Sequence, residues 1–108
     1  MSKGEYLAEF ELYVMLAVLR RNGEAYGASI RREIEGRTGR PVSIGAVYAT
    51  LGRLSDKGFV EFEMSEPRPV PGGRARKQVR LTKEGTAAVE HSSAMLLKMM
   101  KGTPVAEW

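Results

Sequence analysis

The stretch SIGAVYATLGRLSDKGFVEFEM, residues 43–64, decides the fold because it contains a complete helix followed immediately by a strand. Ser43 stands where its hydroxyl can accept a hydrogen bond from a free backbone N–H of the first helical turn. Gly58 stands where helices commonly end. The apolar residues between them recur at a spacing that predicts one core-facing stripe. That stripe consists of Ile44, Val47, Leu51 and Leu54.

The hydrophobic period changes from the helical to the strand value after Gly58. Val60, Phe62 and Met64 alternate with glutamates, which predicts a strand with one buried face. The segment SEPRPVPGGRAR, residues 65–76, is rich in proline and glycine, and KQVRL after it alternates again. We therefore expect a two-stranded hairpin with a long basic loop at its tip.

Three further helices are predicted around this unit. The first, Glu5–Arg21, is apolar on most sides, so we expect it to be sandwiched between two partners. The second, Tyr26–Arg37, ends at a segment that contains glycine and proline. Thr82 can cap the fourth, which runs from Lys83 to about Lys101 and has the spacing of a short coiled-coil seam. The seam residues are Val89, Ser92, Leu96 and Met99.

The predicted order of elements is helix, helix, helix, strand, strand, helix. It gives a mainly α fold with a two-stranded β hairpin, which is the order of a winged helix-turn-helix domain with an added C-terminal helix. We expect one domain, with the winged helix-turn-helix in residues 5–81, the C-terminal helix in residues 82–101 and a tail in residues 102–108.

The composition restricts the class of protein. The chain has 108 residues, of which 43% are hydrophobic and none is cysteine, so we expect one core and neither disulfides nor a thiolate metal site. The N-terminal sequence MSKGEYLAEFE lacks the apolar run of a signal peptide. The longest apolar run, Val14–Leu19, is too short to span a membrane. We expect a cytoplasmic protein that does not associate with membranes.

Positive charge is concentrated in the predicted hairpin. The formal net charge is +4, and five basic residues but one acidic residue lie between Glu66 and Arg80, both ends included. The basic residues are Arg68, Arg74, Arg76, Lys77 and Arg80. Such a cluster is usually a solvated loop, but beside a helix-turn-helix it favours contact with a DNA backbone or minor groove.

The face of the predicted third helix opposite its core stripe is a second candidate DNA surface. Gly45 and Ala49 are small enough to let the helix backbone approach a DNA groove. The longer side chains that can reach phosphates or base edges are Tyr48, Thr50 and Arg53. Two alternatives stay open, in which Tyr48 fills a gap within the fold and Arg53 pairs with Asp56.

Several motifs, taken in order, resemble those of the PadR family of bacterial transcriptional regulators. AYGASIRREIEGRTGRPVSIGAVYATLGRLSDKGFVE and GGRARKQVRLTKEG carry the resemblance, which covers roughly residues 7–88. Each motif alone is weak evidence for the resemblance, but the complete set in this order is specific to the family. The chain departs from the family at Gln78 and Val79, where an aromatic pair is usual, so looser packing of the wing is expected.

The resemblance implies a repressor that binds double-stranded DNA at a palindromic operator. On the recognition helix, the residues that correspond to the DNA-binding surface are Ser43, Gly45, Tyr48, Ala49, Thr50 and Arg53. In the wing they are Gly73, Arg74, Arg76 and Lys77.

The resemblance also implies a homodimer in which the C-terminal dimerisation helix crosses the first helix of the partner. The expected interface residues are Leu7, Phe10, Val14, Val89, Met95, Leu96, Met99 and Met100. Effectors of such regulators, where they exist, bind at the dimer interface, which suggests a small apolar effector. The alternative is that the methionines fill the dimer core.

Other classes of function have less support in the sequence. His91 is the only histidine, and Ser92 and Ser93 beside it point in different directions on a helix. No catalytic set or zinc site can be assembled from them, so we expect no enzyme activity, metal or cofactor. A winged helix that binds protein instead of nucleic acid is the alternative, but its wing should be neutral or acidic. The sequence favours a DNA-binding regulator associated with the bacterial nucleoid.

Overall fold

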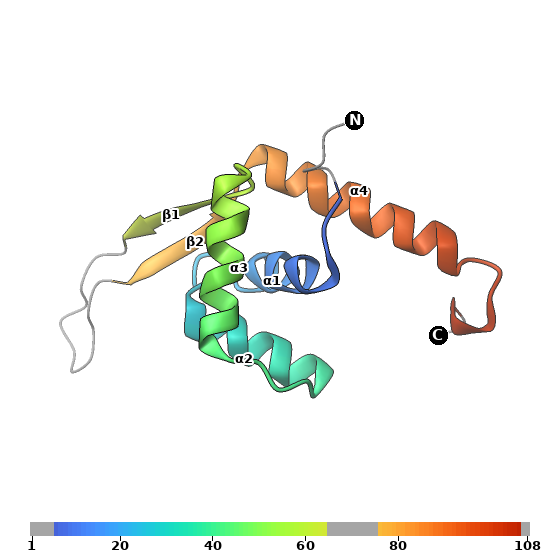
Figure 1. Cartoon of the computed structure of the whole chain (residues 1–108), viewed down its shortest axis with the longest axis horizontal. Helices are drawn as coiled ribbons and strands as arrows, with labels where there is room; N and C mark the ends of the chain where they lie inside the picture. The colour runs from blue at the N-terminus through green and yellow to red at the C-terminus, as the bar shows by residue number, and fades with distance from the viewer. Residues whose placement is uncertain (1–5, 65–75, 107–108) are drawn as a thin grey trace.

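The computed structural model describes residues 6–64 and 76–106, and its element order is the one expected from the sequence (Figure 1). The helices are α1 (Glu9–Arg20), α2 (Gly27–Thr38), α3 (Ile44–Asp56), α4 (Lys83–Met100) and the short 3-10 helix η2 (Pro104–Ala106). The strands are β1 (Val60–Met64) and β2 (Lys77–Leu81). The mainly helical fold with a two-stranded antiparallel hairpin is confirmed. Among the described residues, no helix is long and apolar enough to cross a membrane.

The two predicted side-chain caps are present. The Ser43 hydroxyl accepts a hydrogen bond from the backbone N–H of Ala46 at 3.1 Å, and the Thr82 hydroxyl accepts one from Gly85 at 3.0 Å. Gly58 adopts a φ of 78° directly after α3, a conformation that glycine reaches without steric cost. These local signals set the limits of α3 and the beginning of α4.

The first helix begins at Glu9, later than the sequence predicts. Ala8 precedes it in an extended conformation, and the Glu11 carboxylate accepts a hydrogen bond from the Ala8 backbone N–H at 3.0 Å. A glutamate in the first turn that reaches back to the cap satisfies a donor the helix itself leaves free. The predicted start at Glu5 lies outside the described residues.

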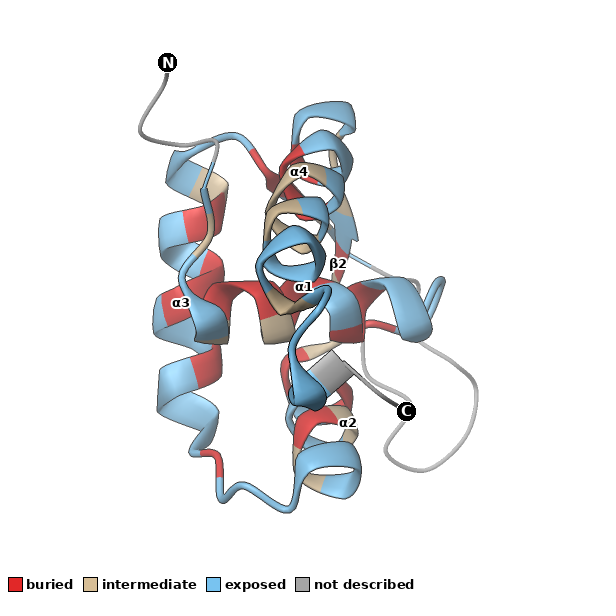
Figure 2. Ribbon diagram, turned by 90° about the vertical axis from the view of Figure 1, so that its right-hand side faces the viewer, coloured by how far each residue is buried: buried red, intermediate tan, exposed pale blue. Residues whose placement is uncertain are grey.

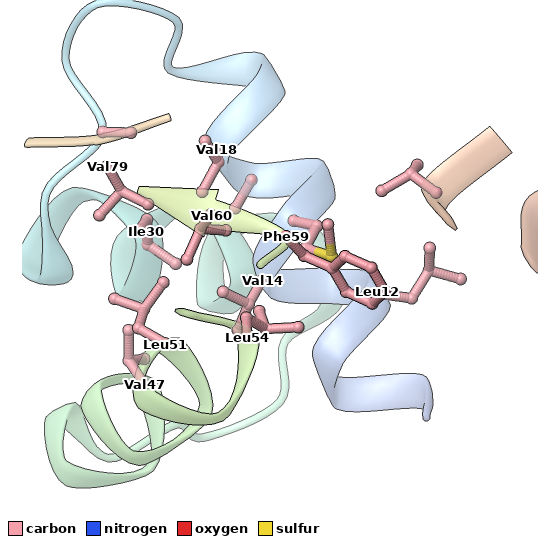
Figure 3. Close-up of a cluster of buried hydrophobic side chains, with 14 of the residues drawn as sticks. Leu12, Val14, Val18, Ile30, Val47, Leu51, Leu54, Phe59, Val60 and Val79 are labelled. Carbon is pink, nitrogen blue, oxygen red and sulfur yellow. The ribbon is translucent and has the colours of Figure 1, made fainter. Parts of the chain in front are cut away.

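One core surrounds α1, whose buried side chains meet those from α2, α3 and the hairpin (Figure 3). From the predicted stripe of α3, Val47, Leu51 and Leu54 are almost fully buried. The prediction was wrong for Ile44, which is 38% exposed because it occupies the first turn of α3, beyond the edge of the core. Helix α3 is thus attached to the core by its last three turns.

The hairpin is antiparallel, and Phe62 of β1 pairs with Val79 of β2. Val79 is buried, and its backbone N–H donates a hydrogen bond to the Ala25 carbonyl at 2.8 Å. The Thr82 N–H likewise donates to the Phe59 carbonyl at 3.0 Å. Valine at position 79 therefore fills the core at the base of the wing.

A partly buried ion pair joins the beginning of α1 to the end of α3. The Lys57 ammonium donates to the Glu11 carboxylate at 2.9 Å, and the Glu11 side chain is 8% exposed. Burial by itself raises the pKa of Glu11, but the hydrogen bonds from Lys57 and Ala8 and the charges of Lys57 and Arg53 outweigh it. The pKa of Glu11 is therefore held below its ordinary value of 4.5.

Replacing Glu11 by glutamine should lower the free energy of unfolding by about 2 kcal/mol at neutral pH, because Lys57 loses its partner. A lowered pKa in the folded state stabilises the fold above the unfolded value. This contribution is complete above pH 4.5 and is lost as the pH falls through the lowered pKa. Urea unfolding from about pH 3 to pH 7 should show this loss in the wild type and a smaller one in the variant.

Glu9→Gln, at an exposed carboxylate, is the control. Equal pH dependence in both variants would contradict the account.

Gly85 should not tolerate alanine. A Cβ atom at this position would lie 1.9 Å from the Phe59 carbonyl oxygen, and a backbone atom cannot move aside cheaply. We expect Gly85→Ala to lower the free energy of unfolding by more than about 2 kcal/mol. Thermal melting beside Gly36→Ala, whose methyl group would enter open space, checks this. Similar melting temperatures for the two variants would contradict the close packing of α4 on the hairpin.

Candidate nucleic-acid interface

Helix α3 presents an uncovered face on the outside of the molecule. In Figure 2 the helix runs along one edge, with buried positions on its inner side and exposed positions on its outer side. The exposed residues are Ser43, Ile44, Gly45, Ala46, Tyr48, Ala49, Gly52 and Arg53. In Figure 1 this face is turned toward the viewer, and the hairpin extends beside it. Most residues assigned to the recognition surface from sequence thus lie on one exposed face.

Thr50 is the exception among the residues assigned to α3. Its side chain is 1% exposed, so the expectation that it reaches DNA is corrected. It follows Val47 by three residues and lies on the same side of the helix, toward the core. The Arg53 guanidinium donates a hydrogen bond to the Thr50 hydroxyl at 3.0 Å. Thr50 thus orients Arg53, and this bond runs back along α3 instead of forward to Asp56.

Two glycines in α3 are not required by packing against the described residues 6–64 and 76–106. A Cβ atom on Gly45 or Gly52 would meet nothing within 4 Å, and neither residue has a positive φ. Glycine inside a helix destabilises it by roughly 0.5–1 kcal/mol relative to alanine. Internal packing would accept a larger residue at both positions. Glycine here is what a surface needs if another molecule approaches its backbone closely.

Tyr48 fits both interpretations left open by the sequence. The residue is 55% exposed, so much of it is available to a partner. The end of the ring also rests against Gly27 of α2, since a Cβ built on Gly27 would lie 2.5 Å from Cζ of Tyr48. The side chain therefore fills a gap against α2 and remains exposed on the surface.

The base of the wing lies close to this helix. Arg76 and Lys77 are exposed, and together with Tyr48 they line an open groove of about 380 Å³. The Arg76 guanidinium lies 5.1 Å from the ring centre of Tyr26, and the Lys77 ammonium lies 4.4 Å from that of Phe62. Aromatic faces attract cations in this geometry and limit where the two charges can lie.

The remaining basic residues of the hairpin differ in their surroundings. Arg80 forms ion pairs with Glu61 at 2.9 Å and with Glu63 at 3.4 Å, so carboxylates of β1 offset its charge. Gly73 and Arg74, which the sequence assigns to the wing tip, lie outside the described residues, as does Arg68. Among the described basic residues of the wing, Arg76 and Lys77 are the two that line the groove beside Tyr48.

Two contributors to this surface were not predicted from sequence. Arg32 of α2 lines the same groove and was not among the residues assigned from the sequence. Ile44 is exposed at the first turn of α3, although its spacing suggested the core. Only the packing of α2 and the hairpin around α3 reveals either residue as part of the surface.

The residues assigned to the dimer interface fall into two groups. Val14 and Val89 are buried in the core of a single chain, so the expectation that they contact a partner is corrected. Leu7, Phe10, Met95 and Met100 are half-buried. Leu96 and Met99 are 52% and 78% exposed, on the half of α4 that projects beyond the other helices in Figure 1. The predicted seam therefore packs on its own chain at its beginning and is uncovered at its end.

Two of the polar residues considered for catalysis, His91 and Ser92, make contacts within the fold. The Ser92 hydroxyl accepts a hydrogen bond from the Leu7 backbone N–H at 3.1 Å, which fastens the segment before α1 to α4. The His91 ring lies 5.0 Å from the ring of Tyr6, centre to centre. Both residues contact the segment before α1 from the middle of α4.

Helix α3 with its exposed face, and beside it a hairpin with basic residues at its base, define the molecule as a winged helix-turn-helix protein. The sequence model of the Transcriptional regulator PadR-like family matches residues 15–91, so the chain belongs to this family of transcriptional regulators. Its members bind DNA and are not enzymes. A comparison with curated proteins gives no match.

Solved structures share the fold. The crystal structure of TA0346 from Thermoplasma acidophilum is 23% identical in sequence, with a TM-score of 0.66 over 82% of each chain. The protein hsRosR is 28% identical in both of its similar structures. In the complex hsRosR-S4 the TM-score is 0.63 over 92% of this chain and 78% of that one. In hsRosR-SG it is 0.68 over 96% and 85%.

Proposed function

We propose that this PadR-like regulator is a homodimeric repressor that reads a palindromic operator with α3 and the wing. The observation that carries the proposal is the outer face of α3, where Gly45 and Gly52 have open space that packing within the chain does not require. The proposed DNA-contacting residues are Ser43, Gly45, Tyr48, Ala49, Arg53, Gly73, Arg74, Arg76 and Lys77. Thr50 contributes indirectly by orienting Arg53.

The exposed apolar residues of α1 and α4 support the dimer. Leu96, Leu97 and Met99 are more than half exposed near the end of α4, and Leu16 and Leu19 are exposed on α1. Several exposed apolar residues on each of two helices favour an interaction site. Packing the end of α4 from one protomer on α1 of the partner covers both surfaces.

The dimer sets the distance between the two recognition helices. Operators bound by helix-turn-helix dimers have half-sites about 34 Å apart, one turn of the double helix. A small apolar molecule bound at the α1–α4 interface would change that distance and so release the operator. The half-buried Met95 and Met100 at the end of α4 would line its site, because methionine adapts to apolar ligands of different shape.

The alternative function is a winged helix that binds protein without reading DNA. The described residues around the groove beside Tyr48 include Arg32, Arg76 and Lys77 and no carboxylate, which suits a polyanion better. The two functions differ in how binding depends on salt, because only nucleic acid releases condensed counterions.

The double variant Arg76→Ala/Lys77→Ala should bind a mixed-sequence duplex more weakly than the wild type. Each lost phosphate contact reduces the slope of log affinity against log salt by about 0.9, so we expect a reduction of about 1–2. Fluorescence anisotropy at several salt concentrations measures both quantities. Arg20→Ala/Arg37→Ala, which removes the same charge beside the α1–α2 pocket, is the control. An unchanged slope in the wing variant would favour the protein-binding alternative.

The double variant Leu96→Glu/Met99→Glu should be monomeric at micromolar concentration by analytical ultracentrifugation. Both side chains are largely exposed within one chain, so the protomer should fold as before. Ala87→Glu/Ala94→Glu adds the same charge at exposed positions on the opposite side of α4 and should remain dimeric. A dimer that survives the first substitution and not the second would place the interface on the other face of α4.

A further inference from the structure

The Tyr48 ring lies so close to Gly27 that any residue with a side chain at position 27 would clash with it. Gly27 is the first residue of α2 and is buried. A Cβ atom there would lie 2.5 Å from Cζ and 2.6 Å from the hydroxyl oxygen of Tyr48. Gly27 has no positive φ, so the backbone does not require glycine. The close approach of the tyrosine ring is what requires it.

The other glycines of the described helices show that this contact is of a different kind. At Gly36, Gly45 and Gly52 an added methyl group would enter open space. At Gly85 it would meet backbone, so that glycine is required for folding. At Gly27 it would meet the end of a side chain that is more than half exposed and can swing away. A substitution there should move the Tyr48 ring and leave the fold in place.

The position of the ring shapes the basic groove at the base of the wing. Tyr48 and Gly27 form one part of its wall, and Arg32, Arg76 and Lys77 supply positive charge from α2 and the beginning of β2. The described lining residues include no carboxylate. A groove with three cations and one phenolic hydroxyl donor is suited to an oxyanion that accepts several hydrogen bonds.

We propose that Gly27 is a positioning residue for DNA binding, because it holds the Tyr48 ring where this groove takes a phosphate of the duplex backbone. The inference rests on the proposed function and extends the interface from α3 and the wing to α2. The phosphate lies beside the bases that face α3, so the contact fixes the register of the recognition helix and does not itself read sequence.

The test uses the full chain and a labelled mixed-sequence duplex of about 30 base pairs at low salt, because a phosphate contact does not depend on an operator. Gly27→Ala should melt at the same or a higher temperature than the wild type, since alanine favours helix. It should nevertheless bind the duplex about five- to tenfold more weakly. Gly36→Ala, in the same helix, should bind like the wild type.

A double-mutant cycle separates positioning from a general effect on α2. In a Tyr48→Ala background, Gly27→Ala should cause no further loss of affinity, because the ring it displaces is already absent. Tyr48→Phe keeps the ring but removes the hydroxyl, and it should weaken binding about three- to tenfold. This variant tests the phosphate contact even if Gly27→Ala were to fold poorly.

Unchanged affinity in Gly27→Ala, or an equal loss in the presence and absence of Tyr48, would overturn the inference. So would wild-type affinity in Tyr48→Phe. These results leave the proposed function intact as long as Arg76→Ala/Lys77→Ala still weakens binding. A wild-type chain that bound no duplex at any salt concentration would instead overturn both the proposed function and the inference.

Discussion

The packing of one side of α3 on α1 is the contact on which the rest of the structure depends. Val47, Leu51 and Leu54 are buried there, and together with Thr50 they make up the inner face of the helix. The outer face is then free to carry small and polar residues, because the core needs nothing more from it. A helix with this division can be held rigidly by the protein and still present its backbone to another molecule.

Two further contacts fix how α3 is presented. The ion pair between Lys57 and Glu11 ties the end of α3 to the beginning of α1, next to the segment that Ser92 fastens to α4. The hairpin starts directly after α3, and its β2 strand is anchored at Ala25, beside the first turn of α2. Helix α3, the wing and α4 are therefore each tied to α1 or α2, or to a segment beside them, by one of these contacts.

The sequence predicted local features well because their causes are local. The caps at Ser43 and Thr82 and most of the alternation in the strands depend on neighbours within a few residues. The prediction was wrong for Met64, which is 62% exposed at the end of β1. Thr50 could have been placed in the core from its spacing to Val47, but its hydroxyl suggested a surface role. Val14 could not be assigned from a stripe alone, because an apolar residue looks the same whether its own chain or a partner covers it. The contact of Gly27 with Tyr48 joins two helices, so the hydrophobic periodicity of the sequence does not reveal it.

Selection of bound sequences from a random duplex library with the purified chain tests the central claim most directly. If the outer face of α3 reads bases within a symmetric dimer, the bound pool should contain an inverted repeat with half-sites about one helical turn apart. A variant in which Gly45 and Gly52 are both glutamate should fold and enrich no such repeat. An enriched repeat that persists in this variant, or a wild-type pool with no shared sequence, would contradict a recognition role for α3.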